Sequence, residues 1–87
     1  MLPFDRQVVG RTIRAIRKER HFSQEVLSGL AGIARTHLTM IESGQKQPNF
    51  ETIWRIAYAL DMTPSELTAR FERETEQAMK QSNPDGK

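Results

Sequence analysis

The sequence predicts an all-α domain of five helices, and three features of the 87-residue chain indicate it. Apolar side chains recur at intervals of three and four residues, as they do on the buried face of an amphipathic helix. Residues that cap helices precede several of these stretches. Two short helical stretches also meet at Gly32, which is the arrangement of two helices joined by a tight turn.

The first helix is expected to begin at Asp5 and to end near Arg20. Its inward stripe consists of Val9, Ile13 and Ile16. The four residues that precede Asp5 form a short, loosely held lead. This helix therefore supplies one wall of the predicted core.

The second helix is expected to follow Ser23, which is a suitable N-cap, with Glu25 in the first turn. Its apolar residues fall at helical spacing: Val26, Leu27 and Leu30. Gly32 then ends the helix. This stretch is the first half of a helix pair that spans residues 23–43.

The third helix carries a polar face that the core does not need. Ile33, Leu38 and Ile41 can face inward together. The opposite side presents other residues: Arg35, Thr36, Thr39 and Met40. Two helices joined by a glycine-containing turn form a helix-turn-helix, so this polar face is a candidate binding surface.

The fourth helix is expected over residues 50 to about 60, with Asn49 as its cap. Its core stripe is made of Ile53, Ile56, Ala57 and Leu60. Trp54 and Tyr58 lie one turn apart and off this stripe, where a monomer exposes them. Two large aromatic side chains at such a position indicate a surface for a partner.

The fifth helix is expected to open at residues 63–66, which form a capping box with proline at the first helical position. It continues through Leu67 and Phe71 toward Met79, because the stretch is rich in helix formers. Phe71 is a second candidate for partner contact if this helix crosses over. Residues 81–87 are expected to form a disordered tail, which leaves a single domain at residues 1–80.

Length and composition exclude several classes. One core in a chain this short is only marginally sufficient, so a partner subunit would help. The chain has no cysteine, which excludes disulfides and thiolate metal sites. No apolar run is long enough to span a membrane, and the N-terminus does not resemble a signal peptide, so we expect a soluble, cytoplasmic protein.

Nothing in the sequence indicates catalysis. His21 and His37 are the only histidines, and no nucleophile has an evident base beside it. Phosphate-binding glycine loops and metal-ligand spacings are also missing from the sequence. We therefore expect neither an enzyme nor a cofactor or metal.

Charge is distributed unevenly along the chain. Residues 1–48 hold eight basic and four acidic side chains, a net charge of +4, whereas residues 49–87 hold five basic and seven acidic ones, a net charge of −2. A basic half beside an acidic half fits a domain that presents one end to a polyanion. Ordinary solvated charge explains the same pattern equally well.

A longer pattern of residues, in order and at matching spacing, covers residues 9–67: Arg17, Ser23, Gln24, Leu27, Ala31, Gly32, Ile33, Arg35, Thr36, Leu38, Ile41, Glu42, Gly44, Pro48 and residues 56–60. With it the chain resembles the Cro and phage-repressor type of helix-turn-helix, the XRE family. The resemblance implies a lambda-repressor-like domain with an extended C-terminal helix. It also implies a sequence-specific DNA-binding transcriptional regulator.

The resemblance assigns structural and phosphate-binding roles within the helix pair. It implies an ion pair between Arg17 and Glu42 that ties the first helix to the end of the third. Gln24 would bind a DNA phosphate beside the free N–H groups of the second helix. A solvent-exposed residue of the first turn is the alternative for Gln24.

The third helix would enter the major groove by its N-terminal part. Arg35 can bind guanine through two parallel hydrogen bonds, and Thr36 can contact a thymine methyl, a base edge or a phosphate. His37 and Thr39 flank them and are candidates for bases or phosphates, and Met40 for a thymine methyl. The alternatives are a solvated His37, and a Met40 that packs against a neighbouring helix.

The ends of the third helix add further expectations. Ala34 stands where the family has serine or threonine, and the missing cap costs about 1 kcal/mol of helix stability. A loop over residues 43–49 follows, with Gly44 as the helix stop. Lys46 and Gln47 are candidates for the DNA backbone. In the family, the position of Asn49 also lies close to the duplex near the operator centre.

One module offers few contacts, whereas a two-fold pair reads two half-sites about 34–36 Å apart on a palindromic operator. We therefore expect a homodimer through the fourth and fifth helices, similar in size to restriction-modification controller proteins. Repression is the default mechanism, and activation through RNA polymerase, with Glu25 as the contact, is an alternative. A different class is an antitoxin-type module that binds a protein through the aromatic face and the acidic C-terminal helix. When bound to DNA, the regulator would lie on the nucleoid.

Overall fold

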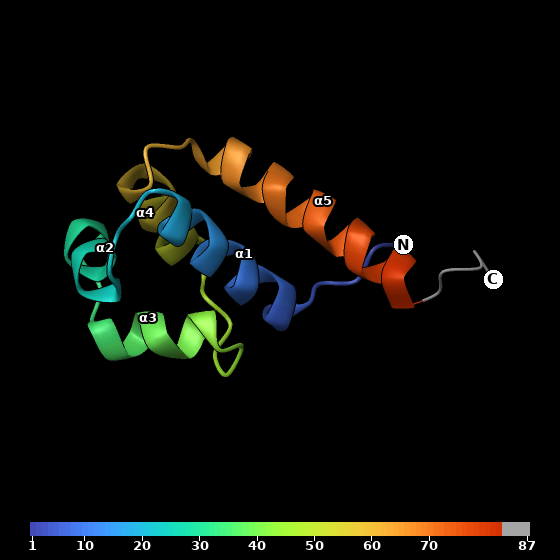
Figure 1. The fold of residues 1–87 in the computed structure, drawn as a ribbon, viewed down its shortest axis with the longest axis horizontal. Helices are drawn as coiled ribbons and strands as arrows, with labels where there is room; N and C mark the ends of the chain where they lie inside the picture. Colours follow the sequence, from blue (N-terminus) through green and yellow to red (C-terminus); the bar gives the residue numbers. More distant parts are fainter. Residues whose placement is uncertain (83–87) are drawn as a thin grey trace.

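The computed structural model describes residues 1–82, and this part of the chain folds into five helices without a strand (Figure 1). The helices are α1 (Arg6–Glu19), α2 (Gln24–Ala31), α3 (Arg35–Glu42), α4 (Phe50–Ala59) and α5 (Pro64–Ser82). α1 packs against α3 and α5, while α2 packs against α3 and α4. The all-α fold expected from the sequence is confirmed. None of the helices described is both long and apolar enough to cross a membrane.

The helices begin at the caps that the sequence predicted. Side-chain oxygens of Asp5, Ser23 and Asn49 accept backbone N–H groups of the following turns at 2.9, 3.1 and 2.8 Å. At the start of α5, the N–H of Thr63 donates to Glu66 Oε1 at 2.8 Å, and the N–H of Glu66 donates to Thr63 Oγ1 at 3.1 Å. Each cap satisfies N–H groups that have no partner within the helix, which sets where the helix starts.

The core lies between all five helices, and the apolar stripes predicted for α1, α3 and α4 supply most of it. Its buried members are Val9, Ile13, Ile16, Leu27, Ala31, Leu38, Ile41, Ile53, Ile56, Ala57, Leu60, Leu67 and Phe71, with Ile33 packed partly buried against them. In α2 the prediction is wrong for Val26 and Leu30, which are 46% and 60% exposed. This short helix buries the neighbouring face instead, through Leu27, Ser28 and Ala31.

Phe71 requires a second correction. It is only 9% exposed and belongs to the same inward stripe of α5 as the fully buried Leu67, one turn earlier. The ring therefore serves the core of its own chain. We remove Phe71 from the candidate partner surface.

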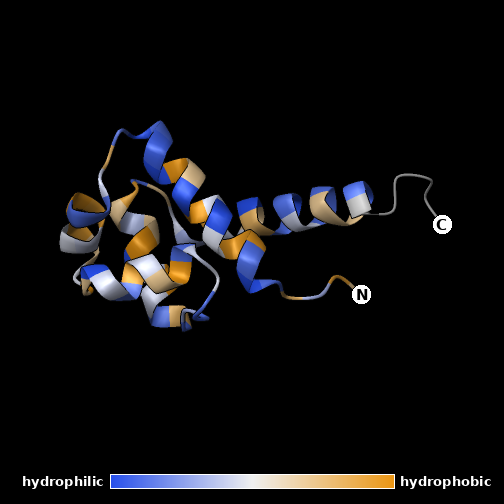
Figure 2. Cartoon of the chain, turned by 60° about the horizontal axis from the view of Figure 1, so that its bottom comes forward, coloured by the Kyte–Doolittle hydropathy of each residue, from blue (hydrophilic) through white to orange (hydrophobic). Residues whose placement is uncertain are grey.

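α5 is longer than expected and extends past the other four helices (Figure 2). It continues to Ser82, so Gln81 and Ser82 belong to the helix rather than to a tail. The remaining residues of the predicted tail, 83–87, lie outside the described residues. The N-terminal lead lies beside α5, where Leu2 and Phe4 line a small groove of about 270 Å³ together with Phe71.

A glycine in α1 allows the close approach of α1 and α3. A Cβ added at Gly10 would meet the backbone oxygens of Ile41 and Glu42, with the Glu42 oxygen at 2.7 Å. Only glycine leaves room for the two helices to touch backbone to backbone. The contact holds the C-terminal end of α3 against α1, and it was not anticipated from the sequence.

Candidate nucleic-acid interface

α3 has one buried face and one free face. Leu38, Ile41 and Glu42 are buried, and the residues on the opposite side are exposed: Arg35, Thr36, Thr39 and Met40. His37 is half-buried, so it is less exposed than either a solvated histidine or a DNA-contacting one would be. Met40 is 41% exposed and therefore available to a ligand. The polar face predicted for the third helix is thus accessible in the monomer.

The predicted ion pair between Arg17 and Glu42 is present. Arg17 Nε donates to Glu42 Oε2 at 2.7 Å and Arg17 Nη2 donates to Glu42 Oε1 at 3.0 Å, so the contact is bidentate. Arg17 Nη1 also donates to the carbonyl of Phe22 at 2.8 Å. Both charged residues are less than 10% exposed, and the fork geometry satisfies their donors and acceptors where little water can reach them. This pair fastens α3 to α1 and to the turn before α2.

Gln24 extends this ion pair into a chain of hydrogen bonds. Its Nε2 donates to Glu42 Oε1 at 3.0 Å, and its Oε1 accepts the hydroxyl of Thr39 at 3.0 Å. The chain from Arg17 through Glu42 and Gln24 to Thr39 therefore links α1, α2 and α3. The sequence suggested only a phosphate contact or a solvated role for Gln24. An amide nitrogen has two N–H groups, so one donor of Gln24 is still available to a phosphate.

The same chain limits what Thr39 can offer to a ligand. Its hydroxyl oxygen lies 3.0 Å from two acceptors, Gln24 Oε1 and the carbonyl of Arg35, and has a single proton to donate to them. Because that proton is used inside the protein, Thr39 presents its methyl group and a lone pair outward. A phosphate needs a donor, so Thr39 is better suited to a base edge than to the DNA backbone.

A hollow of about 420 Å³ opens beside this chain between α1, α2 and α3. Its lining residues are Arg14, Arg17, Gln24, Thr39, Glu42 and Ser43. Arg14 is exposed here, and the sequence analysis did not single it out. Arg14 lies in the middle of α1, and its neighbours along the chain did not indicate that α3 would pack nearby.

The loop after α3 keeps its polar residues outward. Gly44 adopts a positive φ of 80°, and the N–H of Gln45 donates to the carbonyl of Met40 at 2.9 Å, which ends the helix as predicted. Lys46, Gln47 and Asn49 are all exposed. All three belong to the loop that follows α3, and Asn49 also caps α4.

An aromatic ridge runs along α4, formed by Phe50, Trp54 and Tyr58. These side chains are 66%, 48% and 56% exposed, and the ring centroids of successive members are 6.1 and 5.8 Å apart. Leu30 of α2 lines a hollow beside Trp54 and Tyr58. Phe50 was not predicted as part of this surface, although it precedes Trp54 by four residues in the sequence. Leu30 was not predicted because its helical spacing is that of a core residue.

Comparison with known families and proteins agrees with this geometry. The family model HTH_3, described as helix-turn-helix, matches residues 13–67. The "ImmF control region 10 kDa protein" of Bacillus phage phi105 is 34% identical over 58 residues, which cover 67% of this chain and 64% of that protein. The "Immunity repressor protein" of the same phage is 37% identical over 59 residues, 68% of this chain and 41% of that protein. The match thus spans less than two thirds of either phage protein.

Solved structures show the same architecture. The restriction-modification controller protein C.AhdI from Aeromonas hydrophila is 34% identical, with a TM-score of 0.69 over 71% of this chain and 94% of its own. The clp gene regulator ClgR from Corynebacterium glutamicum shares the fold over 98% of this chain and 90% of its own, with a TM-score of 0.86 at 16% identity. Their names describe a controller protein and a gene regulator. The chain belongs to the HTH_3 family, the XRE-type helix-turn-helix DNA-binding transcriptional regulators.

Proposed function

We propose that the protein is a repressor that binds a palindromic operator as a homodimer, with α3 in the major groove. One observation carries this proposal: α3 keeps its polar face free while Arg17, Gln24 and Glu42 lock its other side to α1 and α2. A helix held rigidly before binding loses little conformational entropy when it meets DNA. The likeness to an immunity repressor of a phage supports repression over activation.

In this proposal, the exposed residues of α3 contact different groups on the bases. Arg35 lies in the first turn, where it can bind the O6 and N7 atoms of one guanine. Thr36 offers a methyl group and a hydroxyl at the next position. Thr39 and Met40 suit a base edge and a thymine methyl, while the half-buried His37 has less reach than its neighbours.

The residues around α3 contact the DNA backbone in this proposal. Gln24 donates its second N–H to a phosphate at the start of α2, where the helix N-terminus also favours an anion. Lys46 and Gln47 contact phosphates from the loop after α3. Asn49 lies close to the operator centre in addition to capping α4.

The aromatic ridge is the centre of the proposed homodimer. Trp54 and Tyr58 expose large apolar surfaces that a second copy would cover, and Phe50 and Leu30 extend the patch. Exposed aromatic clusters of this kind are typical of protein interfaces. Pairing through α4 places two copies of α3 on one DNA molecule.

Selection of bound fragments from random duplex DNA tests the operator and its symmetry together. We expect an inverted repeat whose half-sites lie about 34–36 Å apart, one helical turn. Sedimentation at micromolar concentration should give the mass of a dimer. Recovery of a single, undivided site by a monomer would contradict the proposal.

A second candidate function is binding of another protein, as in an antitoxin. Two exposed features favour it: the aromatic ridge on α4 offers an apolar surface, and α5 exposes the acidic residues Glu66, Glu72 and Glu76. Capture of partners from source cells with and without nuclease separates the two. A partner that survives nuclease supports this function, whereas loss of every partner supports the repressor. RNA polymerase would be such a partner if Glu25, exposed in the first turn of α2, mediates activation.

A further inference from the structure

α1 carries a stripe of basic side chains outside the helix-turn-helix. Arg11, Arg14 and Lys18 are spaced by three and four residues, so they share one face of the helix, and all three are exposed. In the described part of the chain, the ion pairs involve Arg17, Arg55 and Arg70, and none involves a member of this α1 basic stripe. Three cations are therefore held together without an acidic partner.

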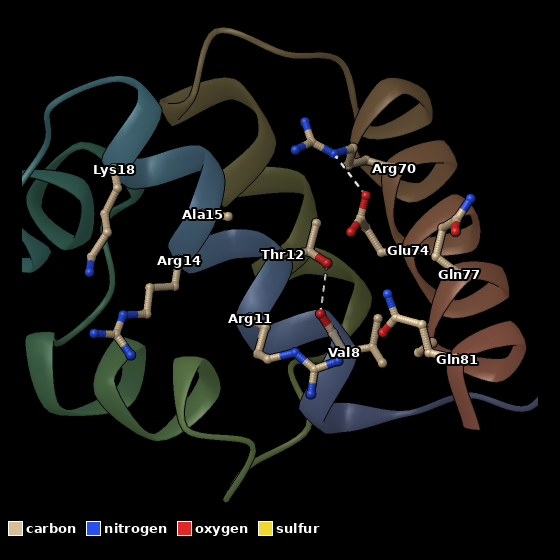
Figure 3. Close-up of a pocket in the computed structure, with 11 residues that line it drawn as sticks. Val8, Arg11, Thr12, Arg14, Ala15, Lys18, Arg70, Glu74, Gln77 and Gln81 are labelled. Carbon is tan, nitrogen blue, oxygen red and sulfur yellow. Dashed lines mark hydrogen bonds and ion pairs between the residues drawn. The ribbon is translucent and has the colours of Figure 1, made fainter. Parts of the chain in front are cut away.

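The stripe borders a groove of about 510 Å³ between α1 and α5 (Figure 3). On the α5 wall, Arg70 Nε lies 3.6 Å from Glu74 Oε2, and this ion pair includes no member of the stripe. Figure 3 shows Arg14 and Lys18 extending from α1 on the side away from α5. The acidic residues of α5 are therefore not the ligand of these two cations.

Arg14 connects the stripe to the surface that reads DNA. It lines the groove beside α5 and also the hollow that contains Gln24 and Thr39. Arg11 and Lys18 lie on either side of it along the helix. The positive charge of α1 is thus continuous with the exposed face of the helix-turn-helix.

We propose that the α1 basic stripe binds the phosphate backbone of the duplex that α3 reads, and so extends the footprint beyond the helix-turn-helix. This inference rests on the proposed function. Arg11 and Lys18 are about 10.5 Å apart along the helix axis, at about 1.5 Å per residue, so the stripe is long enough to reach more than one phosphate of a strand. Arginine binds phosphate through two parallel N–H groups, so the spacing and the chemistry agree.

An acidic protein is the competing ligand for these cations, and the surroundings argue against it. Protein interfaces depend on aromatic or apolar anchors in pockets. Between Arg11 and Lys18, the only exposed apolar side chain of α1 is Ala15. The aromatic ridge lies on α4, which does not border this groove. A polyanion without apolar groups is the better match.

A salt titration with charge-matched variants tests the inference. The double variant Arg14→Gln/Lys18→Gln removes two charges from α1, and Arg73→Gln/Lys80→Gln removes two exposed charges from α5. Binding to one duplex is measured by fluorescence anisotropy between 50 and 200 mM salt. We expect the slope of log K against log salt to fall by about 1.8 units in the α1 variant, at about 0.9 per phosphate, and to stay nearly unchanged in the α5 variant.

Ethylation interference then locates the contact. In the wild type, a set of phosphates should weaken binding when ethylated, and the α1 variant should become insensitive at part of that set. Thermal unfolding followed by circular dichroism checks that both double variants fold. The variant Arg14→Lys keeps the charge at this position, so it should keep most of the salt slope of the wild type. Equal losses of slope in both double variants, or no loss in either, would overturn the inference. If the wild type does not bind duplex DNA, the proposed function is overturned as well.

Discussion

At the scale of single residues, the chain from Arg17 to Thr39 decides how firmly α3 is held. Its two charged members are buried, so removal of one leaves the other without an opposite charge in a largely buried site. Gln24 and Thr39 add neutral hydrogen bonds that are shared between helices. We therefore expect this chain of contacts to fix the position of α3. A change in the chain should alter DNA specificity only indirectly, through the position of that helix.

Arg17→Ala should lower the free energy of unfolding by about 3–5 kcal/mol, because it strands the buried carboxylate of Glu42. Urea denaturation followed by circular dichroism measures the change. The double variant Arg17→Met/Glu42→Leu removes both charges and keeps the volume, so it should lose much less. If the single and double variants were equally unstable, packing rather than the ion pair would explain the loss.

Arg35→Ala should cost about 1–3 kcal/mol of binding free energy and relax the preference at one base position, because its two parallel bonds to guanine are lost. Lys46→Ala is the matched comparison, since it should weaken all sequences alike and lower the salt slope by about one unit. Binding to the selected operator and to random DNA distinguishes the two effects. Equal losses of Arg35→Ala on both DNAs would remove Arg35 from base recognition.

At the scale of elements, the contact between α1 and α3 depends on a position without a side chain. Gly10→Ala should lower the free energy of unfolding by about 1–3 kcal/mol, as overpacking does, because the added Cβ meets the backbone of α3. Gly29→Ala is the control, since a Cβ there has nothing within 4 Å. In α2 that change should instead stabilise the protein by about 0.4–1 kcal/mol. Equal effects of the two changes in urea denaturation would show that backbone entropy alone governs both.

The start of α3 offers a stabilising change. Ala34 has the extended backbone of an N-cap, with φ −66° and ψ 143°, but makes no side-chain cap hydrogen bond. Ala34→Ser should add that bond and stabilise the domain by about 0.5–1 kcal/mol. Differential denaturation in urea measures the gain, with Ala34→Val as a variant that cannot cap in this way. A gain from valine as large as that from serine would contradict the explanation.

At the scale of the whole molecule, the aromatic ridge is the surface through which we propose that two copies associate. Trp54→Ala should weaken self-association, because it removes the central ring of the aromatic ridge, which packs against both Phe50 and Tyr58. Sedimentation at micromolar concentration measures the mass, and Arg73→Ala on exposed α5 serves as the control. A variant that keeps the mass of the wild type would show that the two-fold contact lies elsewhere.

The sequence allowed much of this structure to be predicted, because its signals are local. Asp5, Ser23 and Asn49 cap N–H groups within three residues, and the apolar stripes of α1 and α4 repeat along one helix. The side of α2 that is buried was harder to predict. Leu30 has the spacing of a core residue, but α2 turns its neighbouring face toward α4.

The sequence by itself determined the helices, their caps and the polar face of α3, because each depends on neighbours within about one helical turn. The tertiary structure alone decided which long-range partners meet. It placed Gly10 against the backbone of α3, joined Gln24 to Thr39, and brought Arg14 beside them. The contact between Gln24 and Thr39 joins residues 15 positions apart, and no periodic pattern along the chain encodes the distance between two helices that pack across a core.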